Sequence, residues 1–271
     1  MSTQILGKVS IFTDVPILEQ IARDMLDGIA DEALCATPVD VVLGVHRYSQ
    51  LPRHRGRPLI GIQTEHFLDA TGARTDETLK PRYLASYLRQ CDLLVDLSPY
   101  NRPYYPWATR LLAGQKLIFG PYLFPSRSVA FDPGRTDELL FVGALNDWRR
   151  KVLGSPGVPP VRVETDLYGG ALSERIRQAA AMVNLHRRPG VYSEVPRLLS
   201  AVLAGKAVVS EPLAPPFVAG RHYVPLGAAQ AADFRAAFEA MRDEIAARYS
   251  FEELLRRVRP GGPNARRGDR S

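Results

Sequence analysis

The sequence predicts a compact α/β protein of two Rossmann-like domains, each with a doubly wound parallel sheet, that face each other across a cleft. Short continuous apolar runs alternate with segments of helical spacing, which is typical of parallel strands covered on both faces. The alternation stops at residues 126–138, where Pro133 and Gly134 interrupt a stretch without periodicity, and then starts again. A chain of 271 residues is long enough for two domains of ordinary size, and clefts between domains commonly bind ligands.

The first domain is expected over residues 1–125. Its strands are expected at residues 9–13, 39–45, 58–62, 92–97 and 116–119. Helices are expected at residues 17–34, which Pro16 opens, at 80–90 and partly at 101–113. The carboxyl ends of parallel strands meet at one edge of a sheet. Polar side chains just beyond these strand ends should line that edge, namely Asp14, His46, Glu65, His66 and Ser98.

Residues 126–138 are expected to be a linker, and the second domain follows over residues 139–258. Its strands are expected at residues 139–143, 161–163, 182–185, 207–210 and 223–226. Its helices are expected at residues 149–153, 173–180, 194–203 and 228–257. Gly205 should end the third of these helices. The last should break near Tyr249, with Ser250 capping the helix that follows.

Composition and charge favour a cytoplasmic globular protein without a metal site. No run approaches the roughly 18 apolar residues of a membrane span, and the N-terminus lacks an apolar signal segment. Cys35 and Cys91 lie far apart, as buried thiols rather than metal ligands. The net charge is +6, and residues 259–271 hold four arginines and one aspartate. This basic tail is expected to be disordered, with weak contact to an anionic membrane as the alternative, and no nucleic-acid-binding motif is present.

The second domain carries two candidate anion-binding segments. In the first, Gly143 ends a strand, and Asn146 should cap the helix that begins near Arg149 and Arg150. Arginine side chains match phosphate oxygens bidentately, so both arginines are candidates for a phosphate contact. The second segment follows the strand at residues 182–185 and leads into the next helix. Its candidate residues are His186, Arg187, Tyr192, Glu194 and Arg197.

The first domain offers acid–base candidates. Glu65 and His66 follow one strand end, where a carboxylate and an imidazole can serve as general acid or base. Asp14 and His46 are candidates of the same kind. The sequence contains no Walker A segment, no Gly-x-Gly-x-x-Gly after its first strand, no Gly-x-Ser-x-Gly and no His-Glu-x-x-His. These absences count against P-loop, dinucleotide-binding, hydrolase and zincin functions.

The second domain also resembles a known family. Residues 139–150, Leu-Leu-Phe-Val-Gly-Ala-Leu-Asn-Asp-Trp-Arg-Arg, resemble the opening of the C-terminal domain of GT-B glycosyltransferases. They are most similar to bacterial glycosyltransferase-like proteins of the spore-maturation (CgeB) type. Residues 182–186, the Glu194-x-x-Arg197 spacing and residues 204–211 are similar to that family's nucleotide-sugar site. The resemblance covers about residues 139–257.

The resemblance implies a glycosyltransferase that needs no metal and no cofactor. Its nucleotide-diphosphate-sugar donor would be held by the C-terminal domain, and a glycan, lipid-linked or small-molecule acceptor by the N-terminal domain. Arg149, Arg150 and His186 would bind the diphosphate, and Glu194, Arg197 and Ser200 would contact ribose or sugar. Asn146, Arg187 and Tyr192 complete the expected donor site, and Glu65 or His66 would act as base.

One departure from the family pattern leaves alternatives open. Retaining GT-B enzymes usually carry two glutamates eight positions apart on the donor-site helix, and Tyr192 and Ser200 occupy those positions in this chain. A non-catalytic module that binds a nucleotide or glycan is therefore an alternative to a transferase. A nucleotide-sugar epimerase of the same fold is another, and inverting or retaining chemistry stays open.

Overall fold

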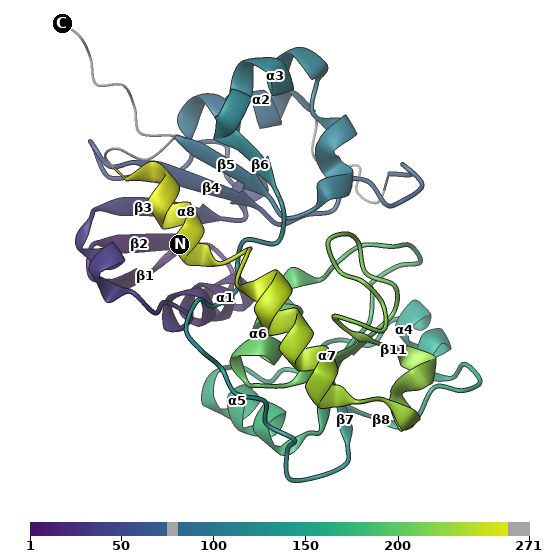
Figure 1. Cartoon of the computed structure of the whole chain (residues 1–271). Coiled ribbons are helices and arrows are strands. Elements are labelled where there is room, and N and C mark those ends of the chain that lie inside the picture. The colour runs from purple at the N-terminus through teal and green to yellow at the C-terminus, as the bar shows by residue number, and fades with distance from the viewer. Residues whose placement is uncertain (75–80, 260–271) are drawn as a thin grey trace, which may run out of the picture. The chain divides into compact units, whose positions relative to one another are not determined.

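A computed structural model of the chain divides into two compact units (Figure 1). Unit 1 comprises residues 1–122 and 249–271, and unit 2 comprises residues 123–248. The structure describes residues 1–74 and 81–259, without the side chains of residues 81 and 82. The predicted disordered tail lies, from residue 260 on, outside the described residues.

Unit 1 contains a six-stranded sheet and four of the α-helices. The strands are β1 Ser2–Leu6, β2 Val9–Thr13, β3 Val39–Leu43, β4 Leu59–Gln63, β5 Leu93–Asp96 and β6 Leu117–Phe119. The helices are α1 Pro16–Asp27, α2 Pro81–Gln90, α3 Trp107–Ala113 and α8 Phe251–Val258. Short 3-10 helices lie at Glu32–Ala36, Val45–Arg47, Pro99–Tyr104 and Gly114–Lys116. The five predicted strands of this unit are confirmed.

The sheet of unit 1 is not doubly wound, so this part of the prediction is wrong. Its strand order is β1-β2-β3-β4-β5-β6, with β2 to β6 parallel and β1 antiparallel at the edge. A doubly wound sheet reverses its strand order at one point, and this order never reverses. The sequence prediction also missed β1, whose residues alternate between half-buried and exposed and form no continuous apolar run.

Two further elements of unit 1 differ from prediction. The helix predicted over residues 17–34 ends at Asp27, because Gly28 follows and the Asp31 carboxylate accepts from the Ala33 N–H to cap a separate 3-10 helix. Helix α8, predicted to belong to the second domain, packs in unit 1 and contacts β4. Its buried Glu252 accepts hydrogen bonds from the N–H groups of Ala30 and Asp31, at 2.6 and 2.8 Å. Ser250 stands at the N-cap of α8, but its side chain makes no capping bond.

Unit 2 contains a five-stranded parallel sheet. Its strands are β7 Leu139–Val142, β8 Val161–Glu164, β9 Ala181–Asn184, β10 Ala207–Ser210 and β11 Val224–Pro225. Its helices are α4 Asp147–Leu153, α5 Gly169–Gln178, α6 Val195–Leu203 and α7 Phe234–Ala240, and a π-helix at Met241–Ala246 follows α7. The helix predicted over residues 228–257 is thus several elements, and its predicted break before Ser250 is confirmed.

The sheet of unit 2 is doubly wound, as predicted. Its order is β11-β10-β9-β7-β8, so the chain leaves β7 on one side for β8 and returns on the other side for β9. The strand order therefore reverses between β7 and β9, and ligands of open α/β sheets bind at the carboxyl end of such a point. Phe141, Val183 and Val209, from three adjacent strands, belong to the apolar core of this sheet.

The predicted linker is part of unit 2. The Asp132 N–H donates to the carbonyl of Gly205 at 2.9 Å, and the Asp132 carboxylate lies 3.2 Å from Nζ of the buried Lys206. Gly205 has a φ of +72° directly after α6, where a Cβ would collide with the carbonyl oxygen of Ala130. Among the described residues, no helix is long and apolar enough to cross a membrane, and no group of three or more His, Cys, Asp and Glu side chains is placed to hold a metal ion.

Candidate functional site

The first candidate site lies where the strand order of unit 2 reverses. Gly143 directly follows β7. It has a φ of +144°, and its N–H donates to the Glu164 carbonyl. A Cβ at Gly143 would lie 3.3 Å from the Phe141 ring and 3.5 Å from a terminal nitrogen of Arg197. Glycine therefore lets the backbone pass close to this arginine. Asn146 then caps α4 as predicted, since its Oδ1 accepts from the Arg149 N–H at 2.9 Å.

Arg149 joins the loops that follow β7 and β9. Its guanidinium donates to the carbonyls of Ala144, Leu185 and His186 at 2.7, 3.2 and 3.1 Å, and the side chain is buried. The Nδ2 of Asn146 adds a bond of 2.6 Å to the carbonyl of Arg187. These bonds satisfy carbonyls at the strand ends and fix the two loops relative to each other.

Arg197 occupies the same edge from the first turn of α6. Its guanidinium donates to Oδ1 of Asn184 at 2.7 Å, and burial lowers its pKa while Glu194 opposes the shift. The guanidinium carbons of Arg197 and Arg149 lie 4.9 and 5.1 Å from the centre of the Phe141 ring, which favours both cations. The buried Arg149 and the half-buried Arg197 therefore converge on the carboxyl end of β7.

The charge of this edge is positive. Glu194 lies 3.6 Å from a terminal nitrogen of Arg149, so the structure pairs it with that residue. The buried Glu211 accepts from the indole N–H of Trp148 at 3.1 Å. Five arginines of α4, α6 and the loop after β9 stand against three nearby carboxylates, a surplus of two positive charges: Arg149, Arg150, Arg187, Arg188 and Arg197 against Asp147, Glu194 and Glu211.

His186 and Tyr192 hold the loop after β9 in place. The His186 ring is fully buried, donates from Nε2 to the Pro212 carbonyl at 2.9 Å and stacks on Tyr192 at 4.2 Å between ring centres. The Tyr192 hydroxyl accepts from the Arg188 N–H at 2.8 Å, and burial raises the pKa of Tyr192 to about 12. Both residues were predicted to contact a donor, and the structure gives each a structural role.

The remaining predicted donor-site residues are Arg150, Arg187 and Ser200. Arg150, on α4, and Arg187, on the loop after β9, are exposed, where an incoming anion can reach them. Ser200 lies on α6, where its hydroxyl donates to the Pro196 carbonyl at 3.3 Å, one helical turn earlier. The position at which the family resemblance calls for a glutamate therefore holds no charge.

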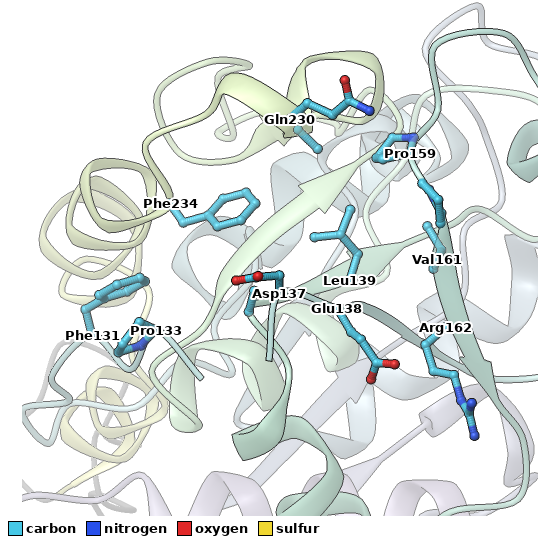
Figure 2. A pocket seen from close by; sticks show the side chains of 13 residues that line it. Phe131, Pro133, Asp137, Glu138, Leu139, Pro159, Val161, Arg162, Gln230 and Phe234 are labelled. Carbon is cyan, nitrogen blue, oxygen red and sulfur yellow. The ribbon is translucent and has the colours of Figure 1, made fainter. Parts of the chain in front are cut away.

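A large pocket of unit 2 lies at the opposite edge of the same sheet (Figure 2). Its volume is about 820 Å³, and its wall includes Leu139 and Val161, the first residues of β7 and β8. Phe131 and Phe234 form apolar walls, while Asp137 and Glu138 contribute carboxylates. Carboxylates repel phosphate, so the chemistry of this amino edge does not suit a nucleotide diphosphate.

The second candidate site lies at the carboxyl edge of the sheet in unit 1. His46 Nδ1 lies 3.0 Å from Oε1 of the buried Gln63, and His46 Nε2 lies 3.4 Å from Oε1 of Glu65. Since the amide oxygen only accepts, Nδ1 carries the proton, and Nε2 faces the carboxylate. Burial lowers the pKa of His46, while Glu65 opposes the shift. The pair can pass a proton between imidazole and carboxylate, and the Glu65 side chain is 46% exposed.

Glu65 and its sequence neighbour His66 were the predicted acid–base candidates, whereas in the structure the imidazole beside Glu65 is that of His46. The role of His66, which is half-buried, stays a prediction. Asp14 pairs with Arg47 at 2.6 Å, beside the same strand ends. Gln63, which orients His46, was not among the predicted site residues, although its position at the end of β4 is the signal that selected Glu65.

A buried carboxylate also supports this edge. Asp96, at the end of β5, accepts from the Ser98 N–H, from Asn101 and from the Tyr105 hydroxyl at 2.8–3.1 Å. Burial raises its pKa to about 7, and these three hydrogen bonds oppose that shift. Asn101 in turn donates to the Glu65 carbonyl at 2.8 Å. Asp96 and Asn101, which the sequence analysis did not select, thus fix the backbone that carries Glu65.

Comparisons with known proteins add only weak similarities. No protein-family model matches the chain, and no curated protein matches its sequence. A crystal structure of a point mutant of S. aureus TarM with fondaparinux, alpha-GlcNAc-glycerol and UDP is similar over 80% of this chain and 54% of its own, at 11% identity and a TM-score of 0.45. Another crystal structure of TarM is similar over 80% of this chain and 49% of its own, at 13% identity and a TM-score of 0.38.

The chain therefore spans about half the length of the solved structures that it matches. Because both TM-scores lie below 0.5, these similarities carry no argument about function.

Proposed function

We propose that the chain binds a nucleotide-diphosphate-sugar at the carboxyl edge of the sheet in unit 2 and transfers its sugar to an acceptor. The observation that carries this proposal is the convergence of Arg149 and Arg197 on the Phe141 ring beside Gly143, where the strand order reverses. Cations held in fixed geometry stabilise negative charge that develops on a leaving diphosphate. This chemistry requires no metal ion.

The exposed arginines supply the first contacts of the proposed donor. Arg150 lies on α4 and Arg187 on the loop after β9, and the bond from Asn146, which caps α4, to the Arg187 carbonyl holds these two segments together. Their guanidinium groups match diphosphate oxygens, whereas the guanidinium of Arg149 is occupied by carbonyls. We therefore assign Arg150 and Arg187 to diphosphate binding, Arg149 to positioning and Arg197 to a contact beside Gly143. Glu194, half-buried beside Arg149, is the candidate for a sugar or ribose hydroxyl.

The proposed acceptor side is the carboxyl edge of unit 1. Glu65 would take the proton of the acceptor hydroxyl, and His46 would share that proton through the 3.4 Å contact. The exposure of the Glu65 carboxylate leaves it accessible to a substrate, and Gln63 holds the His46 ring in one orientation.

Calorimetry with UDP, GDP and dTDP and with their sugars tests the donor site. We expect one nucleotide series to bind, and we expect Arg150→Ala combined with Arg187→Ala to weaken binding by roughly tenfold or more. Both residues are exposed, so melting temperatures should stay unchanged. Arg162→Ala, an exposed arginine at the amino edge, is the matched control and should leave affinity intact. Unchanged affinity in the double variant would contradict the assignment.

A second function has its own observation. Ser200 and Tyr192 occupy the positions at which the family resemblance calls for two glutamates, and both hydroxyls bond to nearby backbone. A chain without those carboxylates can bind a nucleotide-sugar and transfer nothing. Turnover of the bound donor with a panel of acceptors separates the candidates: glycosylated product supports the transferase, isomerised donor an epimerase, and intact donor a binding module.

A further inference from the structure

Helix α3 of unit 1 presents an apolar face to the outside. Trp107, Leu111 and Leu112 are 72, 73 and 86% exposed, and Ala108 between them is also exposed. Single exposed apolar residues are normal, but a cluster of large ones on one short helix marks an interaction surface. This surface, Trp107, Ala108, Leu111 and Leu112, is called the α3 face below.

The arrangement reverses the usual pattern of a surface helix. At 100° per residue, the four residues of the α3 face span an arc of about 140°, and none of them is polar. The inward residues are Thr109 and Arg110, which are half-buried, and Ala113, which is buried. A helix adapted only to water would place its polar residues outward. The apolar arc is therefore unexplained by the packing of unit 1.

The sequence that flanks this face carries charge of one sign. Residues 97–122 contain no aspartate or glutamate, and Arg102, Arg110 and Lys116 give the stretch a charge of +3. Arg102 is exposed, whereas Arg110 and Lys116 are half-buried, and Lys116 donates to the Leu88 carbonyl. The half-buried Tyr100 and Tyr104 accompany the exposed tryptophan, whereas Tyr105 lies in the core. Tryptophan and tyrosine favour the membrane–water boundary, and basic residues near a bilayer are attracted to anionic lipid headgroups.

We propose that the α3 face docks unit 1 on an anionic lipid bilayer, with Trp107, Leu111 and Leu112 inserted at the level of the acyl boundary and the exposed Arg102 at the headgroups. Apolar insertion and headgroup attraction together form the pattern of a peripheral membrane contact. A symmetric dimer through this face fits less well, because residues 97–122 offer no carboxylate to pair Arg102 of either copy.

Co-sedimentation of the full chain with vesicles tests this proposal. The two probes are vesicles of phosphatidylcholine alone and vesicles of equal parts phosphatidylcholine and phosphatidylglycerol. We expect binding to the anionic vesicles, and a loss of roughly tenfold or more in the partition coefficient with Leu111→Ser combined with Leu112→Ser. The matched control is Ile17→Ser combined with Val218→Ser, since these are exposed apolar residues elsewhere and should not change binding.

Further arms separate the proposal from its rivals. Removal of residues 260–271 should leave most vesicle binding intact, whereas a complete loss would assign the contact to the tail. Quenching of Trp107 fluorescence by brominated acyl chains, measured in a Trp148→Phe background, should occur only with anionic vesicles. Absent vesicle binding, or binding that the Leu111 and Leu112 changes leave intact, would overturn the proposal. A dimer in sedimentation velocity that these changes dissociate, without vesicle binding, would assign the face to a second copy.

Discussion

The carboxyl edges of the two sheets differ in both topology and chemistry. In unit 2 the strand order reverses between β7 and β9, and the buried Arg149 and the half-buried Arg197 occupy the edge. In unit 1 the strands run in sequential order, and the edge holds an imidazole and two carboxylates, His46, Glu65 and Asp96. One edge therefore concentrates positive charge, and the other provides groups that exchange protons.

The difference shows how each edge obtains its rigidity. Around the reversal, the loops after β7 and β9 leave in different directions, and the side chain of Arg149 ties them by bonds to three carbonyls. In the sequential sheet, the buried Asp96 carboxyl group accepts hydrogen bonds from Ser98, Asn101 and Tyr105. An arginine therefore fixes the loops of one edge, and a carboxyl group fixes those of the other.

The largest effect is expected from Glu65→Gln. Loss of a general base should lower turnover by about 10²–10⁴-fold. The affinity for the nucleotide should stay constant in calorimetry, because the proposed donor contacts belong to unit 2. Glu32→Gln, which removes another exposed carboxylate of unit 1, is the control and should retain activity. A variant with normal turnover would remove the acid–base role from this edge.

Arg149→Ala should have the next largest effect. It would leave three carbonyls and the half-buried Glu194 carboxylate without their shared partner, and each buried acceptor left unsatisfied costs about 1–3 kcal/mol. Urea unfolding measures this free energy. Arg150→Ala, at the next and exposed position, should change it by less than about 0.5 kcal/mol. Equal effects at the two positions would contradict the structural role of Arg149.

Asp96 should make the stability of unit 1 depend on pH. Its pKa of about 7 in the folded state lies above the ordinary value of about 3.9 for an unfolded chain, so the folded state binds the extra proton between these values. Its contribution is therefore full below about pH 4 and is lost as the pH rises to about 7, about 4 kcal/mol in total, because one pKa unit corresponds to about 1.4 kcal/mol. The free energy of unfolding of the wild type relative to Asp96→Asn should fall accordingly. A difference that stays constant from pH 4 to 8 would show that the hydrogen bonds keep the carboxylate ionised.

Gly143→Ala should have the smallest effect. A side chain at a φ of +144° is strained by about 1–3 kcal/mol, and its Cβ would press on Phe141 and Arg197. We expect a modest loss of stability together with weaker nucleotide binding. Gly157→Ala also has a positive φ, but its Cβ would meet no neighbour, so only stability should change there. Matching effects on binding in both variants would place Gly143 outside the donor site.

Local sequence patterns predicted most strands, because each buried strand is a continuous apolar run such as residues 39–43 or 207–210. They missed β1, because its residues alternate between half-buried and exposed and form no continuous apolar run. They could not predict strand order, because it depends on pairing between distant segments. The assignment of α8 to the wrong unit has the same origin. Its helical spacing is visible in the sequence, but its partners Ala30 and Asp31 are more than 200 residues away.

The candidate sites follow the same rule. Capping of α4 by Asn146 is a local interaction and was predicted correctly. The pairing of Glu65 with His46 joins the ends of two strands, so sequence proximity pointed to His66 instead. For Arg149 and His186, the sequence indicated the correct edge, but only the carbonyls around each side chain show that these groups already have partners.

The return of α8 to unit 1 affects how the chain is made. A ribosome completes all of unit 2 before it synthesises the helix whose Glu252 satisfies the N–H groups of Ala30 and Asp31. Until α8 is synthesised, the surface of unit 1 that α8 covers, including the N–H groups of Ala30 and Asp31, therefore stays exposed. Unit 2, a continuous segment, is the natural candidate for excision or transplantation, whereas a fragment cut after residue 122 loses the last piece of its own core.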